Sequence, residues 1–323
     1  MYKRQAIREP LKGLKVVIDF GNGSTWRTRS VYENLGCEVF SLNENPDGRF
    51  PAHHPDPIKA KYRKQLEEET VKTAEKEKEK EVVGFGHDED GDRVIYIRSD
   101  GRVVEGDRTL SIQAKEIISE YRKKNRKPKF MGEVKFSRIA EEFITGNGGI
   151  YIMTPTGFAF IKEGMKEICR AVRDGKESIH LFGREIDLRD RETVVLAAEL
   201  SGHQMCGHEE NWMFDDATFA AMKVLTAIAR GRREGKTFID LDEEVPRYPA
   251  TPELNIRLPT NVLSEKEGVV LEALKLFEQK GLPIDRTDGG IIKWYDDRGW
   301  VGQALIRKSN TQPMIICLSL IHI

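Results

Sequence analysis

Alternating strand and helix patterns along most of the chain limit the possible folds more than any other feature. The stretch LKGLKVVIDFGNGS reads as a buried strand, at 16–20, followed by a glycine turn and the start of a helix. A short helical pattern and the next strand, CEVFSLN, come directly afterwards. This strand-helix-strand order is typical of parallel α/β layers. We therefore expect an α/β fold.

Changes in this pattern divide the chain into three parts. A length of 323 residues favours two or three domains. A second α/β unit begins near Thr109, and from about Pro249 the pattern becomes strand, helix and two strands around a turn. We expect two α/β domains and a small α+β domain that is incomplete at its C-terminus, at 6–108, 109–248 and 249–317.

The two ends of the chain are set apart from this division. The final LSLIHI can be encoded by DNA whose reverse complement reads MYKRQ, the first five residues, when GTG serves as the start codon. Our hypothesis is that both ends, 1–5 and 318–323, are translated adapter DNA and that natural sequence runs from about Ala6 to Cys317. Neither end enters the expected fold.

Composition points to a cytoplasmic protein that binds neither nucleic acid nor membrane. The 52 lysines and arginines almost cancel the 53 aspartates and glutamates, so no general charge attracts the chain to either partner. No apolar run reaches the roughly 18 residues of a membrane-spanning helix, and MYKRQAIREP lacks the apolar core of a signal peptide. The four cysteines form no C-x-x-C pair, as expected of reduced thiols in the cytosol.

The segment GHDEDGDR places Asp88, Asp90 and Asp92 at every second position. In extended backbone alternate side chains face the same way, so these carboxylates can converge on one point, where they repel unless a cation lies between them. Oxygen ligands in a short loop suit Mg²⁺. An EF-hand is excluded, because Arg93 and Ser99 stand where it needs glycine and glutamate. The alternative is an acidic surface turn.

The segment RKSNTQP follows a strand pattern and combines donors suited to phosphate. Arg307 offers a planar fork of N–H groups, and turn amides can add an anion nest. The short polar side chains of the same segment are Ser309, Asn310 and Thr311. The alternative is an ordinary polar loop between two strands.

The segment AELSGH ends a strand pattern with groups suited to a sugar. Glu199 and Ser201 can bond vicinal hydroxyls, which leaves His203 for proton transfer. Lys135, at another strand end, is a candidate contact to phosphate or hydroxyl. The alternative for Lys135 is an isolated surface lysine.

With these three segments in this order, the chain resembles the α-D-phosphohexomutases, and most of all the bacterial phosphomannomutase/phosphoglucomutase group. Such enzymes have four domains, three α/β and a smaller fourth. The resemblance implies an isomerase, an intramolecular phosphotransferase that moves phosphate between C1 and C6 of a mannose or glucose phosphate. A phosphoserine of the first domain would donate the group, through a hexose 1,6-bisphosphate. The likeness covers nearly all of 6–317, including VVIDFGNG, PDGRFPAHHPDP, TPELNI and GWVGQALIRKSNTQP.

The resemblance also assigns a role to each candidate residue. It implies that the three aspartates bind Mg²⁺ in the second domain and that Arg93 is the arginine of the same loop. It implies sugar-hydroxyl contacts for Glu199 and Ser201, and proton transfer for His203; Lys135 joins Arg93 and His203 as a candidate catalytic residue. The phosphate-binding loop matches Arg307, Ser309, Asn310 and Thr311.

One departure concerns the nucleophile. The chain opens at the first strand of the second domain, and no T-A-S-H-N-P-type serine loop occurs in its 323 residues. We expect a fragment that lacks the first domain of its parent enzyme, is inactive alone, and exposes the surface which that domain covers. The alternatives are a non-catalytic protein that binds Mg²⁺ and sugar phosphate, or one half of a split mutase.

Other departures bear on the preferred hexose. Phe158 stands where dual-specificity enzymes carry histidine, and Leu200 replaces the glutamine typical of phosphoglucosamine mutases, which disfavours an amino sugar. Ala198 stands where glycine is usual, and the segment at 171–194 is longer than expected. The preferred hexose and the oligomeric state stay open.

Overall fold

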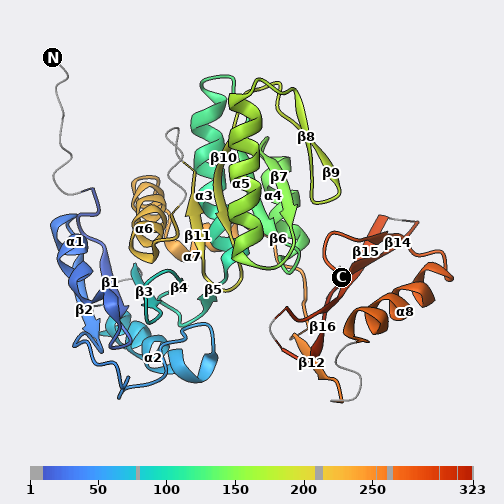
Figure 1. The fold of residues 1–323 in the computed structure, drawn as a ribbon. Coiled ribbons are helices and arrows are strands. Elements are labelled where there is room, and N and C mark those ends of the chain that lie inside the picture. The colour runs from blue at the N-terminus through green and yellow to red at the C-terminus, as the bar shows by residue number, and fades with distance from the viewer. Residues whose placement is uncertain are drawn as a thin grey trace.

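The computed structural model describes residues 10–77, 81–207, 214–251, 253–259, 265–297, 299–310 and 312–321. Three larger sheets follow one another along the chain, and Figure 1 shows the second unit lying between the other two. The first two units are α/β layers and the third is an antiparallel sheet with one helix, as the strand and helix patterns predict. The expected fold class is confirmed.

The first sheet is parallel at its centre and antiparallel at one edge. β1 pairs in parallel with β2 and β3, and β4 and β5 extend the sheet as antiparallel strands. Across the sheet the strands are β2 (Glu38–Leu42), β1 (Lys15–Asp19), β3 (Val82–His87), β4 (Val94–Ile97) and β5 (Val103–Val104). The connecting helices are η1 (Ser24–Thr28), α1 (Arg29–Asn34) and α2 (Ala60–Glu77).

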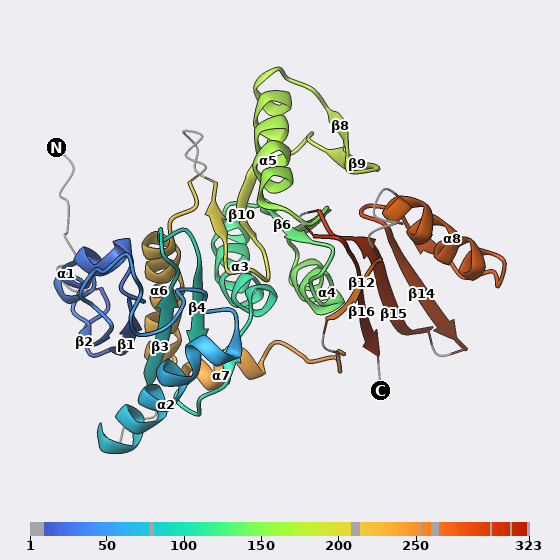
Figure 2. The ribbon, with the colours of Figure 1, turned by 60° about the horizontal axis from the view of Figure 1, so that its bottom comes forward.

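Both faces of this sheet are covered, which explains why three apolar residues follow one another in β1. Val17 packs beneath Leu66 of α2, whereas Val16 and Ile18 point to the opposite face, because alternate side chains of a strand face opposite ways. The helix α6 (Ala217–Arg233) packs on that opposite face, although it comes about 200 residues later in the chain by the numbering. Figure 2 shows α6 against the first sheet, beside β3 and β4.

The second unit is a mixed sheet between two helical layers. Its strands are, across the sheet, β11 (Gln204–Cys206), β10 (Val194–Ala198), β6 (Lys129–Glu133) and β7 (Ile150–Thr154). α3 (Gly106–Arg122) and α4 (Arg138–Gly146) cover one face, and α5 (Phe158–Arg173) covers the other. α7 (Phe238–Glu243) follows α6. The chain then passes to the third unit.

The third unit is a five-stranded antiparallel sheet that carries one helix. Its strands are, across the sheet, β12 (Leu254–Arg257), β16 (Met314–Ile321), β15 (Gly299–Lys308), β14 (Gly290–Asp296) and β13 (Ile284–Asp285). Ile292 faces α8 (Lys266–Glu278), whereas Ile291 packs against Val134 and Met153 of the second unit. Residues 318–321, set aside from the expected fold, pair with β15.

Two elements of the second unit have no counterpart in the expected fold. α4 lies between β6 and β7, and the longer segment at 171–194 contains a hairpin of β8 (Ser178–Leu181) and β9 (Arg184–Asp187). Among the described helices, none combines the length and the apolar character needed to cross a bilayer.

Candidate functional site

The acidic loop, residues 88–93, begins where β3 ends and is shaped around one buried carboxylate. The side chain of Asp88 is fully buried. Its Oδ1 accepts the backbone N–H groups of Gly91 (3.2 Å) and Arg93 (3.1 Å), and its Oδ2 accepts Nε of Arg93 (2.6 Å). Asp88 therefore fixes both the course of the loop and the position of the Arg93 guanidinium.

The three alternate aspartates of the acidic loop form a group that could hold a metal ion. Asp88, Asp90 and Asp92 each offer a carboxylate oxygen, and these oxygens lie within 4.8 Å of one another. Burial, reinforced by the Asp88 carboxylate, raises the pKa of Asp92 to about 7. A divalent cation would relieve the repulsion between the three carboxylates. An all-oxygen donor set is the kind that Mg²⁺ takes. The residues present fit such an ion.

The acidic loop meets the AELSGH loop, residues 198–203, through the backbone. The N–H of Val94 donates to the carbonyl of Gly202 (3.1 Å), and Arg93 and His203 form an isolated β-bridge. Gly202 has φ +93°, and a Cβ there would lie 2.9 Å from the Val94 carbonyl oxygen. Only glycine allows this close approach, so the contact brings the first and second units together at the site.

His203 lies beside the acidic loop in a partly apolar setting. Its Nδ1 is 3.7 Å from Oδ2 of Asp92 and 3.8 Å from Oδ2 of Asp215, and it has no hydrogen-bond partner among the described residues. The ring of Phe158 stacks on its imidazole at 4.8 Å. Burial lowers the pKa of His203 below its ordinary value, against the opposing effect of Glu199. The neutral imidazole is therefore favoured.

Glu199 is buried at the end of β10 and orders the rest of its loop. Its Oε1 accepts the N–H of Gly157 (3.0 Å), and its Oε2 accepts the hydroxyl of Ser201 (2.9 Å). The following amide, Leu200 N–H, donates to Oε1 of Glu133 (2.8 Å). Burial raises the pKa of Glu133 to about 7; the Glu199 charge adds to the rise and Lys135 opposes it. The buried carboxylates of Glu199 and Glu133 thus hold the AELSGH loop in place by hydrogen bonds.

Lys135 lies at a cavity rather than on an open surface. Its Nζ is 3.9 Å from Glu133 and 3.8 Å from Glu253, which belongs to the third unit. A cavity of about 380 Å³ opens beside it, with Ser201 and Gly202 in the same wall. Lys135 is therefore not an isolated surface lysine, and its charge faces the same space as the AELSGH loop.

The RKSNT loop, residues 307–311, reaches the second unit at a single residue, Thr156, both directly and through Asp288. Nε of Arg307 donates to Oδ2 of Asp288 (2.8 Å), which also accepts the N–H of Thr156 (3.0 Å). Nδ2 of Asn310 donates to the Thr156 carbonyl (3.1 Å). The hydroxyl of Ser309 accepts the N–H of Gln312 (3.1 Å). Thr311 lies outside the described residues.

The structure thus links all three predicted segments, and it adds residues that sequence patterns did not single out. The acidic loop contacts the AELSGH loop directly, and the turn at 155–157 joins the AELSGH loop to the RKSNT loop. The added residues are Glu133, Asp215 and Asp288. No local pattern marks Glu133 or Asp215, whereas Asp288 stands in the turn sequence TDGG, whose glycines were the available signal.

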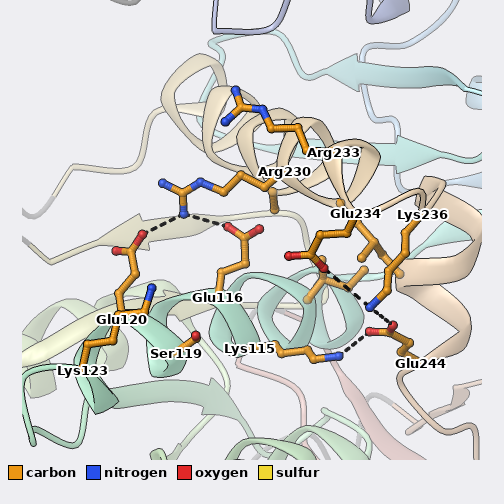
Figure 3. Close-up of a pocket in the computed structure, with 14 residues that line it drawn as sticks. Lys115, Glu116, Ser119, Glu120, Lys123, Arg230, Arg233, Glu234, Lys236 and Glu244 are labelled. Carbon is orange, nitrogen blue, oxygen red and sulfur yellow. Dashed lines mark hydrogen bonds and ion pairs between the residues drawn. The ribbon is translucent and has the colours of Figure 1, made fainter. Parts of the chain in front are cut away.

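A second hollow, of about 460 Å³, lies between α3, α6 and α7, and none of the predicted site residues lines it. Figure 3 shows that its charges are mostly paired: Arg230 bridges Glu116 and Glu120, and Glu244 accepts from Lys115 and Lys236. Because its charges neutralise one another, this hollow offers no concentrated charge to a ligand. The ion pairs around it join α3 to α6 and to the residue that follows α7.

Comparison with known proteins matches two family domains to this chain. The family model described as "Phosphoglucomutase/phosphomannomutase, alpha/beta/alpha domain II" matches residues 2–101, and the one for domain III matches residues 105–248. The phosphomannomutase/phosphoglucomutase of Pseudomonas aeruginosa is 31% identical over 307 residues, which cover 94% of this chain and 56% of that protein. The corresponding protein of Pseudomonas syringae pv. tomato is 32% identical, with the same coverage.

Solved structures give the same result. A phosphoglucomutase/phosphomannomutase family protein from Burkholderia thailandensis is 25% identical with a TM-score of 0.70, over 95% of this chain and 56% of that one. An Aspergillus fumigatus N-acetylphosphoglucosamine mutase, solved with GlcNAc-6P and magnesium, shares the fold at 13% identity and a TM-score of 0.56, over 97% and 59% of the two chains. The chain spans about half the length of the curated relatives it matches.

Proposed function

This chain belongs to the α-D-phosphohexomutase family, and from that premise we propose that it forms the metal- and sugar-phosphate-binding part of a phosphomannomutase/phosphoglucomutase. The proposed reaction moves phosphate between C1 and C6 of a mannose or glucose phosphate through a hexose 1,6-bisphosphate. The observation that carries the proposal is that three segments far apart in sequence meet: the acidic loop contacts the AELSGH loop, and the turn at 155–157 joins the AELSGH loop to the RKSNT loop.

In this proposal the acidic loop serves the transferred phosphoryl group. Asp88, Asp90 and Asp92 would hold Mg²⁺, which when bound supplies electrostatic stabilisation of the phosphoryl group. Arg93, fixed by its 2.6 Å bond to Asp88, would direct its remaining N–H donors to phosphate oxygens. Positioning and charge, rather than covalent chemistry by these side chains, are what phosphoryl transfer requires.

The AELSGH loop and the RKSNT loop would hold the sugar. Glu199 and Ser201, already hydrogen-bonded to each other, would accept from and donate to neighbouring sugar hydroxyls, and Lys135, which lines the same cavity as Ser201, would contact these hydroxyls too. Arg307, with Ser309 and Asn310, would bind the phosphate that is not transferred.

His203 is proposed to move the proton of the reacting hydroxyl. A neutral imidazole can accept a proton, and burial favours the neutral form of His203 at neutral pH. Phe158 stacks on the same ring and offers no hydrogen bond to sugar or phosphate, unlike the histidine of dual-specificity enzymes. The choice between mannose and glucose therefore depends on the other contacts.

We further propose that these 323 residues bind hexose phosphates without turning them over, because they include no T-A-S-H-N-P-type serine loop. The phosphoryl donor would be a serine outside this sequence. A non-catalytic binding protein would bind equally well, and half of a split mutase would become active when the serine-bearing half is added. Turnover of glucose 1-phosphate by a clean preparation of this chain alone would contradict the proposal.

Isothermal titration with glucose 1,6-bisphosphate and Mg²⁺ tests the assignment of the sugar-phosphate site. We expect Arg307→Ala to weaken binding by about ten-fold or more, because a charged hydrogen bond is worth about 1.5–3 kcal/mol. Arg257→Ala, an exposed arginine on β12 of the same unit, is the matched control and should bind as the unaltered chain does. Equal binding by Arg307→Ala and the control would remove the phosphate assignment.

A further inference from the structure

We propose that Asp288 is a positioning residue: it directs the guanidinium of Arg307 toward phosphate and holds the RKSNT loop against the turn that supports Glu199. The inference rests on the proposed function, since it names how the phosphate site is kept in shape. It assigns a role to a residue outside the three predicted segments.

The first support is the pair of bonds that one oxygen of Asp288 accepts. Oδ2 receives Nε of Arg307 at 2.8 Å and the backbone N–H of Thr156 at 3.0 Å. Arg307 is only 2% exposed and Asp288 is 15% exposed, so water competes little for either group. Asp288 thus ties a side chain of the third unit to the backbone of the second.

The second support is an N–H group of Arg307 that remains unused. Nη2 is buried and has no hydrogen-bond partner among the described residues. A guanidinium is planar, so a bond at Nε also sets the plane in which the Nη donors point. A buried donor without a partner costs about 1–3 kcal/mol, and an oxygen of a bound phosphate would remove that cost. Asp288 therefore holds Arg307 ready for an anion.

The third support is the tight packing of the turn that carries Asp288. Gly289 has φ +69°, and a Cβ there would lie 2.3 Å from the carbonyl oxygen of Ile306 and 2.8 Å from Cα of Arg307. Only glycine fits between these atoms. The backbone next to Asp288 is consequently held against β15, which keeps Asp288 close to Arg307.

The fourth support is the continuity of contacts from Arg307 to Glu199. The N–H of Thr156 donates to Asp288 and its carbonyl accepts Nδ2 of Asn310, so the third unit holds both backbone groups of one residue. The next N–H, of Gly157, goes to Glu199 at 3.0 Å. The separation between phosphate contact and sugar contact is therefore set by hydrogen bonds that begin at Asp288.

Binding to the full 323-residue chain tests the role of Asp288 in the site. Titration with glucose 1,6-bisphosphate and Mg²⁺ should show about ten- to a hundred-fold weaker binding for Asp288→Ala. Asp288→Asn, whose side chain has the same shape and keeps one acceptor oxygen, should lose less affinity. Asp297→Ala, an exposed aspartate beyond β14, is the control and should bind normally. Normal binding by Asp288→Ala overturns the inference.

A double substitution separates positioning from general stability. If Asp288 acts mainly through Arg307, Asp288→Ala should weaken binding much less once Arg307 is alanine, and the remaining loss should reflect its bond to Thr156. An equal loss in both backgrounds overturns the proposal, since Asp288 would then act by another route. Urea unfolding of Asp288→Asn checks that the variant is folded.

A spectroscopic measurement decides the matter without ligand. In ¹⁵N spectra the Nε–H signal of Arg307, identified by its loss in Arg307→Ala, should exchange slowly with water and should exchange faster in Asp288→Ala. An unchanged signal overturns the positioning role. If the unaltered chain binds no hexose bisphosphate, the proposed function fails, and this signal still reports on Asp288 by itself.

Discussion

At the scale of single residues, the site depends on carboxylates that burial makes costly to ionise. Asp88 is stabilised by two amides and a guanidinium, whereas Glu133 has one amide and lies near the charge of Glu199. The spacing of Asp88, Asp90 and Asp92 was visible in the sequence. The roles of Glu133 and Asp288 could not be read from the sequence, because their hydrogen-bond partners, Leu200 and Thr156, lie 67 and 132 residues away.

Glu133→Gln should change how stability depends on pH. The folded-state pKa of Glu133 is about 7, above the value of about 4.3 expected in the unfolded chain. A raised carboxyl pKa contributes stability that is present below the unfolded value and is lost as pH rises toward 7 and beyond. Urea unfolding should therefore find Glu133→Gln similar to the unaltered chain at pH 5 and more stable at pH 8.

Glu163→Gln, on the exposed face of α5, is the control for this comparison and should follow the unaltered chain at both pH values. A Glu133→Gln variant with no gain at pH 8 would show that the buried carboxylate is compensated in some other way.

At the scale of elements, the site is made where loops from different strands touch, and Gly202 makes the closest of these contacts. We expect Gly202→Ala to push the AELSGH loop away from Val94 and to weaken hexose bisphosphate binding several-fold. Gly183→Ala is a matched control, because Gly183 has a similar positive φ of +76° but no atom within 4 Å of a new Cβ. Titration of both variants with hexose bisphosphate separates the effect of the close contact at Val94 from the effect of backbone strain at a positive φ.

Equal binding by the two glycine variants would mean that the loops can part without cost. In that case the contact at Val94 would not shape the site.

Sequence patterns predicted most strands and helices but not the hairpin of β8 and β9. Its turn has Phe182 at φ +53° and Gly183 at φ +76°. A two-residue turn with both φ values positive normally carries Asn-Gly or Asp-Gly, because bulky residues avoid that conformation. Phe-Gly gives no such signal, so only the folded chain discloses the turn. The strands of the α/β units were predictable because burial on both faces leaves long apolar runs.

At the scale of the whole molecule, a buried carboxylate joins segments from both α/β units. Asp242 of α7 is fully buried and pairs with Arg98, which follows β4, at 2.6 Å, and also with Arg108 of α3 and with Arg247. Asp242→Ala would leave these guanidinium groups without their shared partner. We expect a loss of about 3–5 kcal/mol in the free energy of unfolding, measured with urea.

Glu243→Ala is the neighbouring control, because Glu243 is 59% exposed and 3.5 Å from Arg98. Its effect should stay within about 0.5 kcal/mol. A small effect of Asp242→Ala would indicate that water or other groups replace the lost carboxylate.

The placement of α6 has a consequence for how the molecule comes apart. Its buried residues, among them Ala220, Val224 and Leu225, complete the core of the first sheet, although the matched family domains divide the chain between residues 101 and 105. Sequence periodicity shows that a helix has an apolar face but not which sheet receives it. Because the core that α6 completes also contains Ile112 and Ile139 of the second unit, the two α/β units should lose protection against hydrogen exchange in a single cooperative step. The third unit has its own core under α8 and a smaller shared cluster with the second unit, so it should open before the other two.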